Sequence, residues 1–203
     1  MAPAIESLLT EHRLIEQVLG SLEAFAQNIS RGADADRETV REYAEFFKNF
    51  ADKCHHGKEE DRLFVKMNEY GFPRDFGPIA VMLTDHVEGR NHVRAIAQVG
   101  DGTGPLTESE RATLVANAQG YIPLLRSHIM KEDNVLYPMA LQAVPPSEME
   151  RLAEDFESFE RDVMGEGAHE HFHALAEKLI QNYPPDPARM APAPSRIGCH
   201  GHM

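Results

Sequence analysis

Two short segments each place a glutamate four residues after a histidine. His55 precedes Glu59 and His128 precedes Glu132, and in both segments a lysine comes directly before the glutamate. Residues four apart lie on the same face of an α-helix, so each segment would present one imidazole and one carboxylate in the same direction. Imidazole nitrogens and carboxylate oxygens are ligands of first-row transition metals. The spacing therefore predicts metal binding.

An internal repeat adds one histidine to each of these segments. The run Leu-Thr-Glu-His that ends at His12 is echoed by Leu-Thr-Asp-His ending at His86, 74 residues later, and the segment at His55 is echoed by the segment at His128 after 73 residues. Such self-similarity predicts two helical hairpins, each with a histidine on its first helix and His-x-x-Lys-Glu on its second. The six candidate metal ligands are His12, His55, Glu59, His86, His128 and Glu132.

Hydrophobic residues at helical spacing accompany these six side chains, so we expect them to point into the protein. A buried imidazole or carboxylate costs several kcal/mol when it is ionised and uncompensated. Metal ions would compensate the whole set at once, and two iron ions suit it best. For His12 or His86 alone, a hydrogen-bonded core histidine would be the simpler explanation. The six together favour a two-metal centre.

Four long periodic segments must position these ligands, and they predict an all-α, antiparallel up-down four-helix bundle. Their approximate ranges are 4–29, 37–70, 75–99 and 107–144. A capping box begins the fourth helix at Thr107, and Gly120 and Pro123 predict a kink inside it. We expect three regions: the metal-binding bundle at 1–146, one or two additional C-terminal helices at 147–183, and a disordered Pro-rich tail at 184–203.

Two choices of ligand stay open within these segments. His56 and Glu60 have the same spacing as His55 and Glu59. Asp52 lies one turn before His56 and predicts a solvated face, so we expect His56 outside the ligand set, either behind a ligand or at the surface. Asp133 is the alternative to Glu132, although the repeat and the hydrophobic stripe favour Glu132.

These motifs resemble the hemerythrin-like (HHE cation-binding) family over roughly residues 4–143. The resemblance rests on His12, His55-x-x-x-Glu59, His86 and the run from His128 to Pro138. It implies a bundle around a non-haem di-iron centre with a bridging oxo, hydroxo or peroxo species. The partner would be a small diatomic ligand or peroxide, which the centre binds, senses or reduces. Iron storage, iron donation and iron sensing are the alternative, and the pattern is closest to bacterial iron-centre repair and iron-sensing members.

One position departs from the oxygen-carrying members of that family, which have His-x-x-x-His on the third helix. Here Arg90 stands four residues after His86. Counting four imidazoles, we expect open positions on both irons and reaction with oxidants in place of reversible oxygen carriage. Arg90 would hold a bridging carboxylate or a bound anion, or extend to the end of the bundle.

Four other features allow two interpretations each. Tyr121 could donate a hydrogen bond at the centre or serve in packing, and packing is favoured. Cys54 could be a redox-sensitive thiol or a buried filler. The cluster of His169, His171 and His173 could bind a second metal or be surface histidines, and the terminal run 199–202 could bind a soft metal only adventitiously.

The charge balance excludes other classes of function. Asp and Glu number 33 against 20 for Lys and Arg, giving a formal net charge of -13. Such a chain repels nucleic acid and anionic membranes. No apolar run approaches the roughly 20 residues of a membrane span, and the N-terminus lacks the pattern of a secretion signal. We expect a cytoplasmic protein whose two cysteines form no disulfide framework.

Overall fold

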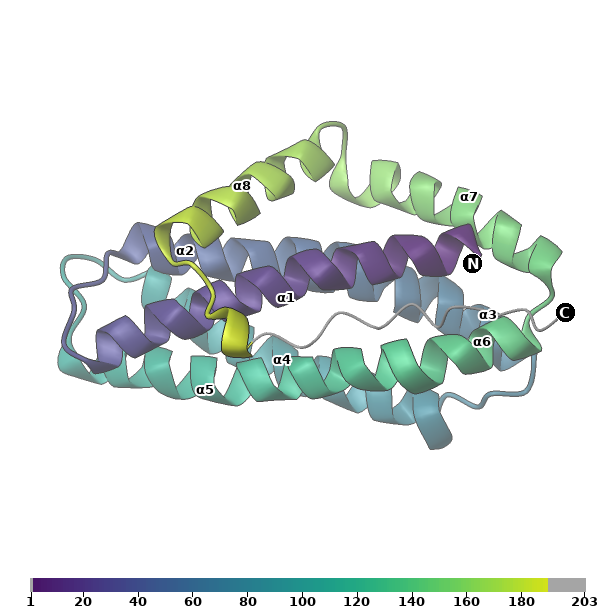
Figure 1. The fold of residues 1–203 in the computed structure, drawn as a ribbon, viewed down its shortest axis with the longest axis horizontal. Coiled ribbons are helices and arrows are strands. Elements are labelled where there is room, and N and C mark those ends of the chain that lie inside the picture. The colour runs from purple at the N-terminus through teal and green to yellow at the C-terminus, as the bar shows by residue number, and fades with distance from the viewer. Residues whose placement is uncertain (1, 190–203) are drawn as a thin grey trace, which may run out of the picture.

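A computed structural model of the chain describes residues 2–189, and in that range it contains helices and no strands (Figure 1). The all-α prediction is confirmed. The α-helices are α1 (Pro3–Ser30), α2 (Arg37–Glu45), α3 (Phe64–Glu69), α4 (Gly77–Gly100), α5 (Glu108–Lys131), α6 (Tyr137–Ala143), α7 (Pro146–Met164) and α8 (Ala168–Asn182). Three π-helical segments, η1 (Phe46–His56), η2 (Glu59–Leu63) and η3 (Glu132–Leu136), and the 3₁₀ turn η4 (Pro187–Arg189) complete the set.

Four antiparallel rods form the bundle: α1, the second rod from α2 to α3, α4, and the fourth rod from α5 to α6 (Figure 1). The second rod begins where the Asp36 side chain accepts a hydrogen bond from the backbone N–H of Thr39, and it ends at Gly71, whose φ of 95° suits glycine. The fourth rod begins with the predicted capping box of Thr107 and Glu110. Local sequence signals thus set both ends of the second rod and the start of the fourth.

Wider helical turns interrupt the second and fourth rods near the candidate ligands. In η1, η2 and η3 the backbone bonds in the i→i+5 pattern of a π-helix, which occurs mostly as short insertions at functional sites. The helix α5 continues through Gly120 and Pro123, and the fourth rod first departs from α-helical bonding at Glu132. These turns shift which residues face the interior.

The hydrophobic core consists of two clusters, one toward each end of the bundle. One contains Ile15, Leu19 and Phe47 among others, and the other contains Leu8, Phe64 and Leu136. Between them, the buried side chains that the bundle encloses are polar, beginning with His12 on α1. The candidate metal ligands therefore lie in the middle of the bundle, between the two hydrophobic clusters.

The C-terminal helices α7 and α8 form a hairpin over α1 and the second rod (Figure 1). Phe156 of α7 belongs to one core cluster, and the Leu179 carbonyl of α8 accepts a hydrogen bond from Ser21 Oγ at 2.8 Å. Gly57 allows α7 to approach closely, since a Cβ there would lie 2.7 Å from Phe159 Cζ. Within the predicted tail, Arg189 Nη1 of the turn η4 lies 2.6 Å from Glu23 Oε1, and residues 190–203 lie outside the described range.

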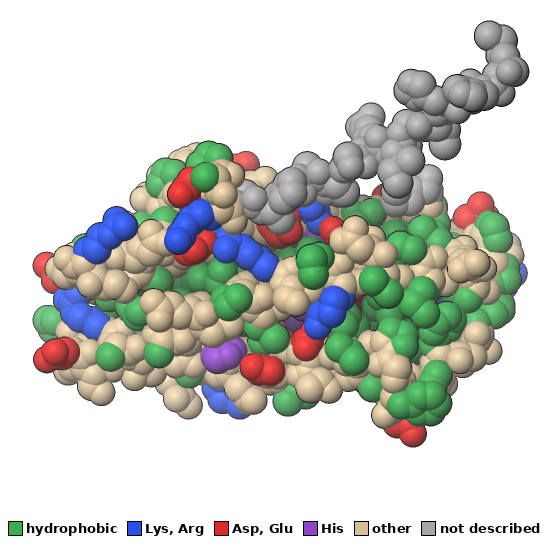
Figure 2. Space-filling model, turned by 60° about the horizontal axis from the view of Figure 1, so that its bottom comes forward, with side chains coloured by type: hydrophobic (Ala, Val, Ile, Leu, Met, Phe, Trp, Pro, Cys, Tyr) green, Lys and Arg blue, Asp and Glu red, His purple; other side chains and the backbone are tan. Residues whose placement is uncertain are grey.

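Charged and apolar side chains are distributed unevenly on the face shown in Figure 2. Basic and acidic groups are interspersed on the left, while hydrophobic side chains gather on the right, over the end of the bundle that holds α3 and α6. The exposed hydrophobic residues include Phe76, Val81 and Val135. No helix within residues 2–189 is long and apolar enough to cross a membrane.

Candidate metal centre

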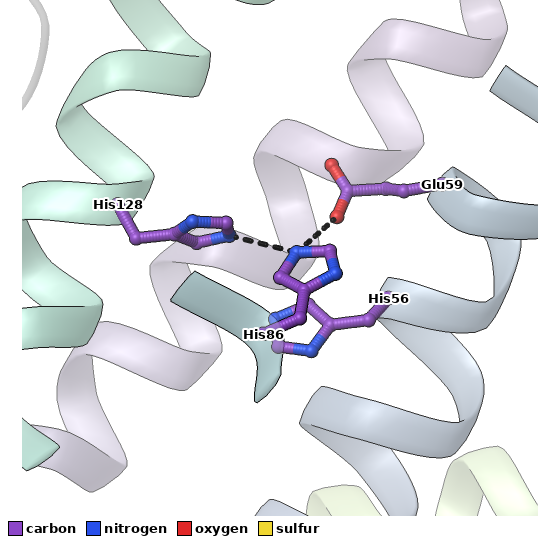
Figure 3. A group of neighbouring side chains, drawn as sticks. All are labelled: His56, Glu59, His86 and His128. Atoms are coloured by element: carbon purple, nitrogen blue, oxygen red, sulfur yellow. Dashed lines mark hydrogen bonds and ion pairs between the residues drawn. The ribbon is translucent and has the colours of Figure 1, made fainter. Parts of the chain in front are cut away.

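All six predicted ligands meet in the middle of the bundle, together with a seventh side chain, His56. The structure arranges them in two groups, each with ligand atoms within 4.8 Å of one another. The two-histidine group consists of His12, His55, Glu59 and Glu132; the three-histidine group consists of His56, Glu59, His86 and His128. Glu59 belongs to both. Figure 3 shows the three-histidine group, in which His86 lies between His128 and Glu59.

The expectation that His56 lies behind the ligands or at the surface is not met. His56 is only 5% exposed, and its ring stacks on that of His86 with centroids 3.8 Å apart (Figure 3). The α-helical spacing used for the prediction does not hold in η1, where i→i+5 bonding lets the neighbouring residues His55 and His56 both face inward. Asp52, expected on a solvated face, is half-buried and accepts from His56 Nδ1 at 3.3 Å.

Each of the five imidazoles places Nδ1 beside a carboxylate that faces away from the centre. The pairs are His12 with Asp133 at 2.7 Å, His55 with Glu11 at 2.8 Å, His56 with Asp52 at 3.3 Å, His86 with Glu60 at 2.7 Å and His128 with Asp85 at 3.2 Å. A carboxylate at Nδ1 favours the tautomer that donates there and leaves the Nε2 lone pair free. The rings are thus oriented to bind metal through Nε2.

Basic side chains in turn hold these carboxylates. Lys58, which is fully buried, contacts Glu11 and lies 3.6 Å from Glu160 of α7, while Arg13 contacts Asp133. Burial alone would raise the pKa of Glu11, but the hydrogen bond from His55 and the charge of Lys58 lower it to about 2. An ionised carboxylate at this position can accept the His55 proton over the whole physiological range.

Arg90 takes neither of the roles expected for it. Its Nε donates to Asp52 Oδ1 at 2.8 Å and its Nη2 to Glu60 Oε1 at 2.6 Å. These are the two carboxylates that hold His56 and His86. Arg90 therefore contacts the three-histidine group only through its supporting carboxylates, and its guanidinium has no lone pair with which to bind a metal.

The internal repeat becomes an approximate twofold symmetry of contacts. Glu11 contacts His55 and Lys58 in one half, just as Asp85 contacts His128 and Lys131 in the other. Symmetry fails at His56, because the residue 73 positions later is the buried Ile129. One substitution between the two halves thus makes the two groups unequal.

Tyr137 is a site residue that the sequence analysis did not single out. Its hydroxyl donates to Glu59 Oε1 at 2.6 Å and lies 3.3 Å from His12 Nε2. The repeat aligns Tyr137 with Phe64, so a polar group stands in one half where the other half has a hydrocarbon. That difference was the available signal.

Several buried polar atoms in the centre have no hydrogen-bond partner among the described residues: His55 Nε2, Glu59 Oε2 and both carboxylate oxygens of Glu132. The Glu132 oxygens do lie close to imidazole nitrogens, 3.1 Å from His128 Nε2 and 3.2 Å from His12 Nε2, but these rings are held to donate through Nδ1. Buried polar groups are nearly always hydrogen-bonded, so four such atoms in one place indicate a missing counterpart. In addition, His86 Nε2 lies 3.1 Å from His128 Nε2, although both rings are held to donate through Nδ1 (Figure 3). Two nitrogens bound to one metal at about 2.1 Å lie roughly this far apart. The donor set fits metal ions.

The comparisons with known proteins agree with this geometry. The hemerythrin HHE cation-binding domain matches residues 4–140. The chain belongs to this family. It is also 23% identical over 176 residues, 87% of this chain and 67% of the relative, to the uncharacterized protein Rv1995 of Mycobacterium tuberculosis and to the uncharacterized protein Mb2018 of Mycobacterium bovis. No solved structure matches significantly.

The charges of this HHE domain respond strongly to burial and to one another. Burial and the neighbouring Glu132 raise the pKa of Glu59 well above its usual range. Burial would also raise the pKa of Glu132, but His128 and His12 outweigh it and lower that pKa. Burial lowers the pKa of His55 to about 3, whereas at His128 the carboxylates of Glu132 and Asp85 outweigh burial and raise the pKa to about 9. The carboxylates therefore attract a cation into the centre, and metal binding replaces protons there.

The remaining candidates lie outside the two groups. Asp133 contacts His12 and Arg13, so Glu132 is the inward carboxylate of the pair. Tyr121 packs edge-on against Phe47 with ring centroids 5.1 Å apart. The rings of His169 and His173 stack on α8, but no third ligand completes a metal site there in the part of the chain that the structure describes. The terminal run 199–202 lies beyond that part.

Proposed function

We propose that this HHE-domain protein holds two iron ions and binds a small oxidant, such as dioxygen, peroxide or nitric oxide, at the resulting centre. The proposed ligands are the six predicted residues, His12, His55, Glu59, His86, His128 and Glu132, with His56 added. The observation that carries the proposal is the sharing of Glu59 between two groups whose buried polar atoms lack partners. A shared carboxylate between two sets of imidazoles suits two neighbouring first-row metals.

The two positions would differ in the type of donor and not in the number. Each group offers four side chains: three imidazoles and one carboxylate in one group, two imidazoles and two carboxylates in the other. The number of donors therefore does not assign the oxidant to one metal. The Tyr137 hydroxyl, 3.3 Å from His12 Nε2, favours the metal held by His12 and His55. The argument from Arg90 counted four imidazoles, and with His56 the count is five.

The protein's own groups would orient the centre and control protons within it. The Tyr137 hydroxyl holds Glu59 through Oε1, which leaves Oε2 facing His86 at 3.6 Å. The same hydroxyl lies 3.3 Å from His12 Nε2, and it could donate to an oxidant there only by releasing Glu59. When bound, two irons supply the electrons for reducing an oxidant, and the buried setting limits access by water.

Metal analysis of protein purified without added metal tests this proposal. We expect two irons per chain and the near-ultraviolet ligand-to-metal absorption of a ferric pair, which peroxide or nitric oxide should alter after reduction. Glu59→Ala should remove most of the iron, because both groups lose a ligand. Glu69→Ala is the matched control, since Glu69 follows on the same rod and is 56% exposed. One zinc per chain without such a band, or equal iron in both variants, would contradict the proposal. Iron that exchanges freely and leaves the protein unreactive to oxidants would favour storage or donation.

A further inference from the structure

A cavity of about 230 Å³ lies between η1, α4 and α5, directly beside the three-histidine group. His56 and the Asp52–Arg90 ion pair form its wall toward the candidate metal centre. From there the cavity follows α4 from Gly89 to Ala97, a distance of about 12 Å at 1.5 Å per residue. The proposed iron ligation does not use this space.

The lining combines an apolar surface with a hydroxyl that lacks a partner. Phe47, Val93 and Ala97 supply hydrocarbon. Tyr121 also lines the cavity and is only 2% exposed, yet none of the described residues forms a hydrogen bond with its hydroxyl. The Tyr121 hydroxyl is not fully enclosed by protein, so it can donate a hydrogen bond to a molecule bound in the cavity.

The cavity is cationic although the protein is strongly acidic. Lys48, Arg90 and Arg94 line it against one carboxylate, Asp52, which Arg90 and His56 already engage. Lys48 and Arg94 are exposed, and neither has an acidic partner in the described range. On a chain of net charge -13, these free cations mark a local site for an anion.

We propose that this cavity binds a small organic monoanion, a carboxylate on an aromatic or branched aliphatic body. The body would pack against Phe47 and Val93, and the carboxylate would accept from the Tyr121 hydroxyl and face Lys48 and Arg94. The size is suitable, because an apolar cavity of about 150 Å³ is known to take up benzene. This inference does not depend on iron, although an anion seated against His56 would alter the spectrum of an iron centre next to it.

Isothermal titration calorimetry with benzoate tests the proposal on the full chain. We expect one benzoate per chain, bound about tenfold more tightly than benzamide, which has the same ring without the charge. Acetate, which has the charge without the ring, should bind more weakly than benzoate by a similar factor. Benzoate that binds no better than benzamide, or that fails to saturate, would overturn the proposal.

Variants separate the proposed contacts from general effects of charge. Lys48→Ala combined with Arg94→Ala should weaken benzoate binding about tenfold, and Tyr121→Phe about fivefold. Ala97→Phe should abolish binding by filling the space while the circular dichroism spectrum stays unchanged. The matched control is Arg151→Ala, which removes a 72% exposed cation from α7. Equal affinities in all variants would place the benzoate elsewhere and refute the assignment.

Chelator-treated protein distinguishes this inference from the proposed function. Benzoate should bind the chelated protein with nearly the same affinity, since the cavity's anion contacts come from Lys48 and Arg94. Absence of iron together with intact benzoate binding would contradict the di-iron proposal alone. Two irons per chain without benzoate binding would contradict the cavity proposal alone.

Discussion

Arg90 and Arg13 provide a way to loosen one metal position at a time without touching a ligand. Arg90 holds Asp52 and Glu60, which orient His56 and His86, so Arg90→Leu should weaken the three-histidine group. Arg13 holds Asp133, which orients His12, so Arg13→Leu should weaken the two-histidine group. The two substitutions remove the same charge from opposite sides of the centre.

The size of the effect follows from the exposure of the ion pairs. Arg90 is 34% exposed and its two partners 26% and 21%, so solvent screens both interactions substantially. At about 0.5–1 kcal/mol for each such pair, the loss comes to about 1–2 kcal/mol. This corresponds to roughly a 5- to 30-fold weaker iron affinity at the three-histidine group. Arg13 supports one imidazole, and its loss should weaken the two-histidine group by roughly 2- to 5-fold.

Competition with a chromogenic chelator measures these affinities, and two backgrounds separate the positions. In His55→Ala the remaining iron would occupy the three-histidine group, and Arg90→Leu should weaken it while Arg13→Leu should not. In His128→Ala the order should reverse. If either arginine variant had the same effect in both backgrounds, the assignment of supports to groups would be wrong. If neither had any effect, the carboxylates would not depend on these arginines.

Two further predictions concern stability and the thiol. Removing both irons should lower Tm by about 16–32 °C under conditions where iron exceeds the Kd of each site by about 1,000-fold, because each emptied site loses about 4 kcal/mol of stabilisation by binding. An unchanged Tm in differential scanning calorimetry would contradict this. Burial raises the pKa of Cys54 to about 12, so in a Cys199→Ser background iodoacetamide at pH 8 should react slowly until guanidinium unfolds the chain. The thiolate fraction rises with pH, so alkylation that is already fast in the folded protein at pH 8 would refute a buried, protonated thiol.

Helical periodicity predicted the four rods and the inward direction of all six ligands, because hydrophobic stripes on both sides of each ligand continue across it. On α1, His12 lies between Leu8 and Ile15, which belong to the two separate core clusters. A histidine on that stripe must either find partners or bind a metal. The capping box at Thr107 likewise marked the start of the fourth rod through its hydrogen bonds to the backbone.

Sequence reasoning failed where the helix departs from the α-helical period. The prediction for His56 took Asp52 as a sign of solvent, but the wider turns of η1 bring both residues toward the centre. Val135 follows His128 by seven residues, where α-helical spacing predicts the inward face, but in η3 it is 50% exposed. The residue types do not indicate i→i+5 bonding. The residues that face inward after such a turn could therefore not be predicted.

The carboxylates that support the histidines could not be predicted from the sequence for a different reason. Glu11, Glu60 and Asp133 each stand next to a candidate ligand in the sequence, where an acidic residue is normally read as part of a solvated face. Their partners come from other rods, because Glu60 of η2 holds His86 of α4 and Asp133 of η3 holds His12 of α1. Contacts between rods depend on how the rods are rotated against each other, which periodicity within one rod does not specify.

The two halves of the repeat differ at a position near the centre where the first half has His56 and the second has Ile129. This difference makes the two metal positions chemically unequal. Two identical halves would supply the same donors to both metal positions, since Glu11, His12, His55 and Glu59 have counterparts in the other half. A third imidazole on one side, where the other side has Glu132 as its fourth donor, makes the two positions differ in charge and not in the number of protein ligands. The cavity lies on the three-histidine side, against His56 itself. An anion there would act on the metal position that has one carboxylate, and the oxidant would bind at the other position, beside Tyr137.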